Sequence, residues 1–211
     1  MRIAASTILC LAMLPALAWA QFPVYDNGPI NGTTDAWTIN FGYIVSDTFT
    51  TTGYFGVSGF SFGVWEFPGD TMSSVDWSVT SGENSGTIFG SGTVSGANLT
   101  DRFISSNQYG YNIDVITVSG LNVTLNSGTY WLNLQNASVP SGDPVYWDEN
   151  SGSGCGGSGC PSSASESALG TIPSEAFTVA QQFPEPSIIL MFGSSALCLV
   201  GMRRWKLRNR S

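Results

Sequence analysis

Residues 121–137 read LNVTLNSGTYWLNLQNA, and this stretch decides the class of fold. Apolar and polar residues alternate on both sides of Asn126-Ser127-Gly128, a period of two that indicates β-strands with one buried face. The Asn-Ser-Gly triplet between them is typical of a tight turn. We therefore predict a hairpin whose two strands face the same core. The core-facing residues would be Leu121, Val123, Leu125, Tyr130, Leu132 and Leu134.

The same alternation recurs along the chain between residues 21 and 180. It is clearest at 37–41, 75–80, 121–125 and 176–179. Gly, Ser, Thr, Asn and aromatic residues dominate this region, whereas the good surface helix formers Lys, Glu and Arg are scarce. We expect nine or ten strands, no helix, and an antiparallel, jelly-roll-like β-sandwich.

The segment between Gln21 and Phe183 is strongly acidic. Arg102 is its only basic residue, against fourteen Asp and Glu residues, which gives a net charge of −13. Nucleic-acid binding depends on Lys and Arg side chains that neutralise phosphates. We therefore exclude nucleic acid as a partner.

The N-terminal twenty residues predict a secretory signal. Arg2 precedes an apolar run, and Ala18-Trp19-Ala20 places small residues at the two positions that signal peptidase inspects. We expect a signal helix over residues 1–20 that is cleaved before Gln21. Signal peptidase is thus one expected partner.

Three features follow one another at the C-terminal end, in residues 181–211. Pro184-Glu185-Pro186 comes first, an uncharged apolar run follows, and a basic cluster comes last. Residues 187–205 predict a transmembrane helix suited to a thin bilayer, and the cluster at 203–211 predicts a cytoplasmic stop-transfer signal. The basic residues of that signal are Arg203, Arg204, Lys206, Arg208 and Arg210.

This tail resembles the PEP-CTERM sorting tail, also called the ice-binding protein C-terminal domain, of exported Gram-negative bacterial proteins. The resemblance covers residues 184–211, with Phe183 where Val is usual. It implies that a membrane-embedded, cysteine-dependent exosortase recognises Pro184, Glu185 and Pro186 and cleaves near them. The implied route is transient insertion into the inner membrane, then delivery to the cell surface or the extracellular space. Residues 21–180, the expected ectodomain, resemble uncharacterised exported β-domains that carry this tail, for example in YDNGP and WEFPGDT.

The chain contains no histidine, which removes several classes of catalysis. Ser-His-Asp and Cys-His nucleophile systems and histidine metal sites are impossible. The class of catalysis that stays possible is a pair of carboxylates acting on a glycosidic bond. Asp148 and Glu149 are adjacent and would point to opposite faces of a strand, so either would need a partner such as Glu66 or Asp76. We expect no enzyme activity and keep a glycosidase as the lesser alternative.

Residues 144–160, PVYWDENSGSGCGGSGC, form the second informative stretch. An exported location predicts a disulfide between Cys155 and Cys160. Carboxylate and amide oxygens around this loop are ligands of the kind that Ca²⁺ prefers. We expect no cofactor but keep calcium as an alternative, and Asp26 and Asn27 would join the loop if the two ends of the domain pair. The calcium candidates are Asp143, Asp148, Glu149 and Asn150.

Two tryptophans are candidates for a ligand surface. Trp131 alternates out of step with its apolar neighbours, and Trp147 precedes the acidic loop. Either a loop covers Trp131 or the ring is exposed to a sugar. Together with the tail, these features predict a non-catalytic surface or matrix protein associated with extracellular polysaccharide. The alternative is a carbohydrate-binding module.

Overall fold

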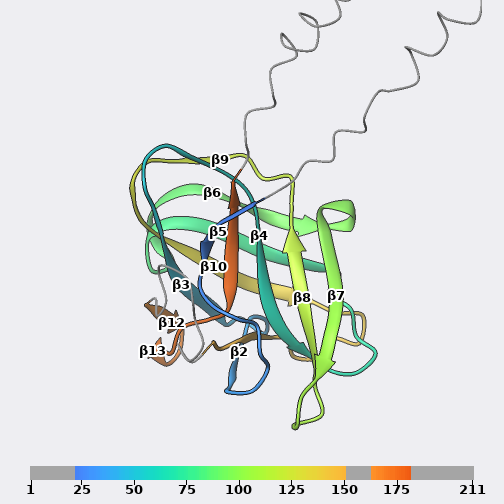
Figure 1. The fold of residues 1–211 in the computed structure, drawn as a ribbon. Coiled ribbons are helices and arrows are strands. Elements are labelled where there is room, and N and C mark those ends of the chain that lie inside the picture. Colours follow the sequence, from blue (N-terminus) through green and yellow to red (C-terminus); the bar gives the residue numbers. More distant parts are fainter. Residues whose placement is uncertain (1–21, 151–162, 182–211) are drawn as a thin grey trace, which may run out of the picture.

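The computed structural model of this chain describes residues 22–150 and 163–181. These residues form an all-β fold of fourteen strands in two antiparallel sheets, with one 3-10 turn at Gly96–Asn98 (Figure 1). The predicted all-β, antiparallel class is confirmed. In the part of the chain that the structure describes, no helix is long and apolar enough to cross a membrane.

Several sequence predictions lie outside the described residues. They are the signal helix at 1–20 with Ala18, Ala20 and Gln21, the sorting motif at 184–186, the transmembrane helix at 187–205, the basic end at 203–211, and the pair Cys155 and Cys160.

The larger sheet has eight strands around β4 (Phe55–Glu66). On one side β4 pairs with β14 (Phe177–Gln181), which pairs with β1 (Phe22–Asp26). Its other partners are β8 (Asn112–Val118), β9 (Val123–Leu125) and β11 (Tyr146–Asp148). Outer strands complete the sheet: β7 (Leu99–Ser106) pairs with β8, and β2 (Ala36–Thr38) pairs with β11.

The smaller sheet has six strands in a single row. Their order is β13 (Gly170–Ile172), β12 (Ala164–Glu166), β3 (Ile44–Thr51), β10 (Gly128–Ser138), β5 (Ser74–Gly82) and β6 (Ser85–Ser95).

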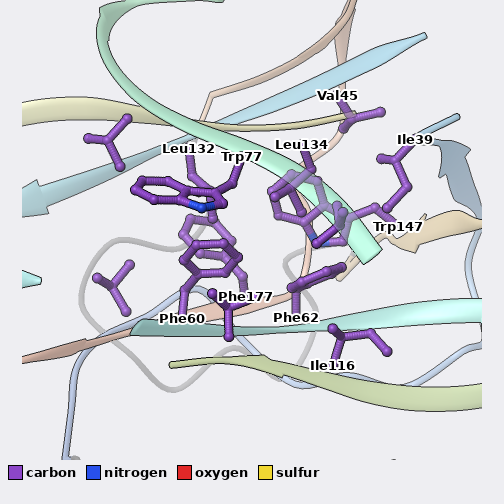
Figure 2. Close-up of a cluster of buried hydrophobic side chains, with 14 of the residues drawn as sticks. Ile39, Val45, Phe60, Phe62, Trp77, Ile116, Leu132, Leu134, Trp147 and Phe177 are labelled. Carbon is purple, nitrogen blue, oxygen red and sulfur yellow. The ribbon is translucent and has the colours of Figure 1, made fainter. Parts of the chain in front are cut away.

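Both sheets contribute side chains to one hydrophobic core (Figure 2). Phe60 of β4 meets Trp77 of β5 across the two sheets, with ring centroids 6.0 Å apart. In β4 the buried Phe60, Phe62 and Val64 recur at every second position, which is the period of a strand with one inner face. Alternation therefore places the side chain of Glu66, the next residue in this series, on the inner face as well.

The pairing predicted for residues 121–137 is wrong. β9 pairs with β4 in the larger sheet, whereas β10 pairs with β3 and β5 in the smaller one. Both edges of β10 are thus already occupied, and the chain passes from one sheet to the other at Asn126. At this corner Thr51 Oγ1 and Tyr130 OH donate hydrogen bonds to the Asn126 carbonyl at 2.5 and 3.1 Å. The two runs do contribute to a common core, as predicted.

Candidate functional site

Three carboxylates from adjacent strands of the larger sheet meet on its inner face. Glu66 ends β4, Asp114 lies on β8 and Asp101 lies on β7. Figure 1 shows these three strands side by side, in agreement with their pairing. One oxygen from each carboxylate lies within 4.8 Å of the others. We call Glu66, Asp101 and Asp114 the acidic cluster.

Two of the three residues of the acidic cluster, Glu66 and Asp114, are buried, Asp101 is half-buried, and the cluster is short of hydrogen-bond donors. Glu66 is 0% exposed and neither of its carboxylate oxygens has a hydrogen-bond partner. Asp114 is 4% exposed and its Oδ2 has no partner either. Asp101 accepts a hydrogen bond through Oδ2 from the backbone N–H of Met72 at 2.6 Å. The loop between β4 and β5 therefore closes over the cluster at Met72.

Burial dominates the electrostatics of the acidic cluster. Removal from water, followed by the charge of Asp101, raises the pKa of Glu66 to about 9. The same two causes raise the pKa of Asp114 to about 6. Burial also raises the pKa of Asp101, although the hydrogen bond from Met72 opposes the shift. The charge of Asp101 thus makes both of its neighbours harder to ionise.

Asp148 is as buried as Glu66 but has a full set of donors. Its Oδ1 accepts a hydrogen bond from Trp65 Nε1 at 2.6 Å, and its Oδ2 accepts one from the backbone N–H of Asn31 at 2.9 Å. The backbone N–H of Gly32 also donates to Oδ1, at 3.1 Å. Burial raises the pKa of Asp148, while these donors lower it. Asp148 therefore fastens the loop between β1 and β2 to the outer face of the sheet.

The residues that the sequence suggested for calcium each have a different hydrogen-bond partner. Glu149 Oε2 accepts a hydrogen bond from Trp37 Nε1 at 3.3 Å. Asn150 donates to the carbonyl of Asn27, which confirms that Asn27 lies beside this loop. Asp143 uses its backbone carbonyl, which accepts from Asn40 Nδ2 at 3.0 Å. With Asp148 held by three donors, these four residues do not gather around one point.

The carboxylate partners suggested for catalysis are also separated. Glu66 belongs to the acidic cluster in the larger sheet. Asp76 lies on β5 of the smaller sheet, where its Oδ2 accepts a hydrogen bond from Asn136 Nδ2 at 2.8 Å. Sequence reasoning named Glu66 alone and missed Asp101 and Asp114. Only the register of three strands brings these side chains together.

Trp147 is not a surface residue, so its prediction as a ligand contact is wrong. It is 0% exposed, and its ring packs against Phe62 and Phe177 at centroid distances of 5.9 and 5.6 Å (Figure 2). Its Nε1 donates to the Ala176 carbonyl at 3.1 Å. The reason is that β11 lies between β2 and β4, with Trp147 on the inner face. Trp131, on β10, is half-buried.

A different set of aromatic rings gathers on the outer face of the larger sheet. Tyr109, in the turn between β7 and β8, stacks on Trp65 with a centroid distance of 5.6 Å and an interplanar angle of 21°. Tyr111 contacts Trp65, Phe67 and Tyr146 at 5.8, 5.0 and 5.6 Å. Tyr109 is 56% exposed and Phe67 is 37% exposed. We call these five residues the aromatic surface.

Neither the protein-family models nor the curated proteins compared with this sequence match it. Functional assignment therefore depends on the residues of this chain.

Proposed function

We propose that this chain is an exported, non-catalytic bacterial surface or extracellular-matrix protein that associates with extracellular polysaccharide through the aromatic surface. Signal peptidase and an exosortase-like membrane protease are its proposed processing partners. The apolar N-terminal run ending at Ala18-Trp19-Ala20 supports export, and Pro184-Glu185-Pro186 followed by an apolar run and a basic cluster supports sorting.

The aromatic surface is the observation that carries polysaccharide association. A sugar ring has an apolar C–H face, which packs on an exposed aromatic ring as other apolar groups do. Tyr109 offers such a ring, held in place by its stacking on the buried Trp65. Phe67, Tyr111 and Tyr146 extend the surface along the same face.

Burial of the closest carboxylates supports a non-catalytic function over a glycosidase. A glycosidase needs two carboxylates about 5–9.5 Å apart with substrate between them. Glu66 has no exposed surface, and the loop at Met72 closes over the acidic cluster. A polysaccharide would have to displace that loop to reach it.

We further propose that the two sheets form a jelly-roll-like β-sandwich, with a signal helix before it and a transmembrane helix after it. The pairing supports this architecture. Consecutive strands β3 and β4 lie in different sheets, and each pairs with a strand from the second half of the fold, β3 with β10 and β4 with β8.

Polysaccharide association is tested by replacing the exposed ring. The full-length chain in detergent is incubated with extracellular polysaccharide isolated from the producing bacterium, and the bound fraction is measured. Tyr109→Ala should weaken binding about ten-fold, equivalent to about 1.4 kcal/mol. Tyr54→Ala is the matched control, because Tyr54 is 76% exposed and lies outside the aromatic surface. Absence of wild-type binding, or equal losses in both variants, would contradict the proposal.

Sorting is tested separately by the intact mass of the protein recovered from membrane and extracellular fractions. The expected product begins at Gln21 and ends near residues 184–186. Replacing all three motif residues with Ala should leave insertion intact and block the second cleavage. A wild-type species that keeps Arg203 to Ser211 would identify a permanent membrane anchor instead.

A further inference from the structure

We propose that Glu66, Asp101 and Asp114 form a binding site for a divalent cation, and that the cation is Ca²⁺. This site lies away from the loop residues that the sequence suggested for calcium, and it is independent of the aromatic surface.

The geometry of three paired strands creates the site. β8 lies between β4 and β7. Asp114 of β8 is paired with Val64 of β4 on one side and with Phe103 of β7 on the other. Glu66 and Asp101 extend from the neighbouring strands on the same inner face, so that three carboxylate oxygens lie within 4.8 Å of one another. A cation placed among them would contact all three.

The missing hydrogen bonds point to a ligand. Buried carboxylates in folded proteins nearly always have hydrogen-bond donors or a cationic partner. Neither oxygen of the fully buried Glu66, nor the Oδ2 of Asp114, has a donor or a cation from outside the cluster, and the only side-chain hydrogen bond open to Glu66 is a proton shared with Asp101. These are the oxygens left free by the protein, since the Oδ2 of Asp101 already accepts from Met72. The two residues that carry these oxygens belong to the group of three carboxylates that meet within 4.8 Å.

The protein itself provides no counter-charge there. In residues 22–150 and 163–181 the only cationic side chain is Arg102. It follows Asp101 on β7, so strand alternation directs it to the opposite face. Asp70, in the loop that covers the cluster, adds a further negative charge that acts on Glu66. The field at this point therefore favours a cation.

The donor set selects Ca²⁺. All three side chains offer hard oxygen atoms, which suit Ca²⁺ or Mg²⁺ rather than softer metals. Mg²⁺ demands near-ideal octahedral geometry and keeps several waters, whereas Ca²⁺ accepts irregular sets of carboxylates and carbonyls. A closed site made of carboxylates and a covering loop fits Ca²⁺ better. Calcium sites of extracellular modules have dissociation constants of about 0.1–1 mM, and we expect that range here.

Direct binding of radioactive Ca²⁺ tests the site. The full-length chain in detergent is freed of metal with EDTA, and bound ⁴⁵Ca²⁺ is measured by equilibrium dialysis. We expect one saturable site, and a rise in Tm of about 3 °C or more at 10 mM Ca²⁺. Glu66→Gln keeps the side-chain volume but cannot lose a proton to become a carboxylate ligand when the ion binds, and it should weaken binding at least ten-fold and abolish the rise in Tm.

Glu175→Gln is the matched control. Glu175 is also 0% exposed, with both oxygens unpartnered, but it lies outside the acidic cluster. This variant should bind Ca²⁺ as the wild type does. If Glu66→Gln does not fold, as judged by circular dichroism, Asp114→Asn takes its place with the same expected loss.

Three results would overturn the proposal. The first is a wild-type chain with no saturable Ca²⁺ binding up to 10 mM. The second is undiminished binding in the cluster variants, which would place the bound ion elsewhere in the chain. The third is saturable binding of Mg²⁺ or Mn²⁺ without Ca²⁺, which would reject the assigned cation.

Discussion

Asp148 and Glu66 are both buried carboxylates on adjacent strands of the larger sheet, yet they have opposite surroundings. Asp148 accepts hydrogen bonds from Asn31, Gly32 and Trp65. Glu66 accepts none. The two side chains leave the sheet on opposite faces, so Asp148 meets a loop rich in N–H donors and Glu66 meets other carboxylates. The first side chain organises the fold, and the second remains available to a ligand.

Close backbone approach explains how Asp148 obtains its donors. Gly32 has a φ of 63°, a conformation that glycine adopts without strain. A Cβ at this position would lie 2.4 Å from the side chain of Ile113. Only glycine therefore lets this loop lie flat against the sheet and direct its N–H groups at the Asp148 carboxylate. The loop over the acidic cluster provides one comparable donor, from Met72 to Asp101.

Asp148→Ala should cause a larger loss of stability than any other substitution proposed for this chain. It leaves two buried N–H donors, of Gly32 and Trp65, and one part-buried donor, of Asn31, without their acceptor, and we expect the free energy of unfolding to fall by about 3 kcal/mol. Urea denaturation followed by tryptophan fluorescence measures the change. Asp143→Ala, at a half-buried loop position, is the control and should change stability by less than about 0.5 kcal/mol. A loss below about 1 kcal/mol for Asp148→Ala would mean that water replaces the carboxylate.

Glu175 extends the comparison, because it too is buried without partners for its carboxylate oxygens. Burial, followed by the charge of Asp47, raises the pKa of Glu175 well above its usual range. The unfolded chain releases this proton near pH 4.5, while the folded chain retains it. Stability from this group is therefore fully present below about pH 4.5 and falls as the pH rises.

Glu175→Gln should remove that part of the pH dependence. We expect the variant to match the wild type near pH 4 and to have the higher free energy of unfolding at pH 7. Denaturation curves at pH 4, 5, 6 and 7 measure the difference. Parallel curves for the two proteins would show that Glu175 ionises normally in the fold.

The sequence predicted a strand wherever it alternates over four residues or more, and it missed short strands that show no such run. The run at 75–80 lies within β5, and that at 176–179 overlaps β14. By contrast β11, β12 and β13 have three residues each, too few to reveal a period, and the alternating runs at 37–41 and 121–125 extend beyond the three-residue strands β2 and β9. The fourteen strands therefore exceed the nine or ten expected. Alternation also defines a face but no partner, which is why β9 and β10 were predicted to pair with each other.

The site was harder to predict than the fold. Asp101 and Asp114 are ordinary acidic residues in the sequence, and their meeting with Glu66 follows from strand register alone. The aromatic surface joins the end of β4, the turn before β8 and β11, which are separated along the chain. Trp147 was misplaced because a tryptophan beside an acidic loop gives no indication of its face. The registers of β8 with β4 and with β7 would have been sufficient to recognise the acidic cluster.

The smallest expected effect is the difference in stability lost when one or the other of two tryptophan hydrogen bonds is removed. Trp65 Nε1 donates to Asp148 at 2.6 Å, whereas Trp37 Nε1 donates to Glu149 at 3.3 Å. Replacement by Phe removes the donor in both cases and keeps an aromatic ring. Because the longer bond is weaker, Trp37→Phe should lower the free energy of unfolding by about 0.5 kcal/mol and Trp65→Phe by about 1.5 kcal/mol.

Urea denaturation of the two variants at pH 7 measures this difference. If Trp65→Phe lowers stability no more than Trp37→Phe, the two backbone N–H groups of Asn31 and Gly32 are sufficient to hold the Asp148 carboxylate. The difference between the hydrogen-bonded Asp148 and the unpartnered Glu66 would then come from the loop between β1 and β2 alone. The Trp65 indole would matter chiefly as the support for Tyr109.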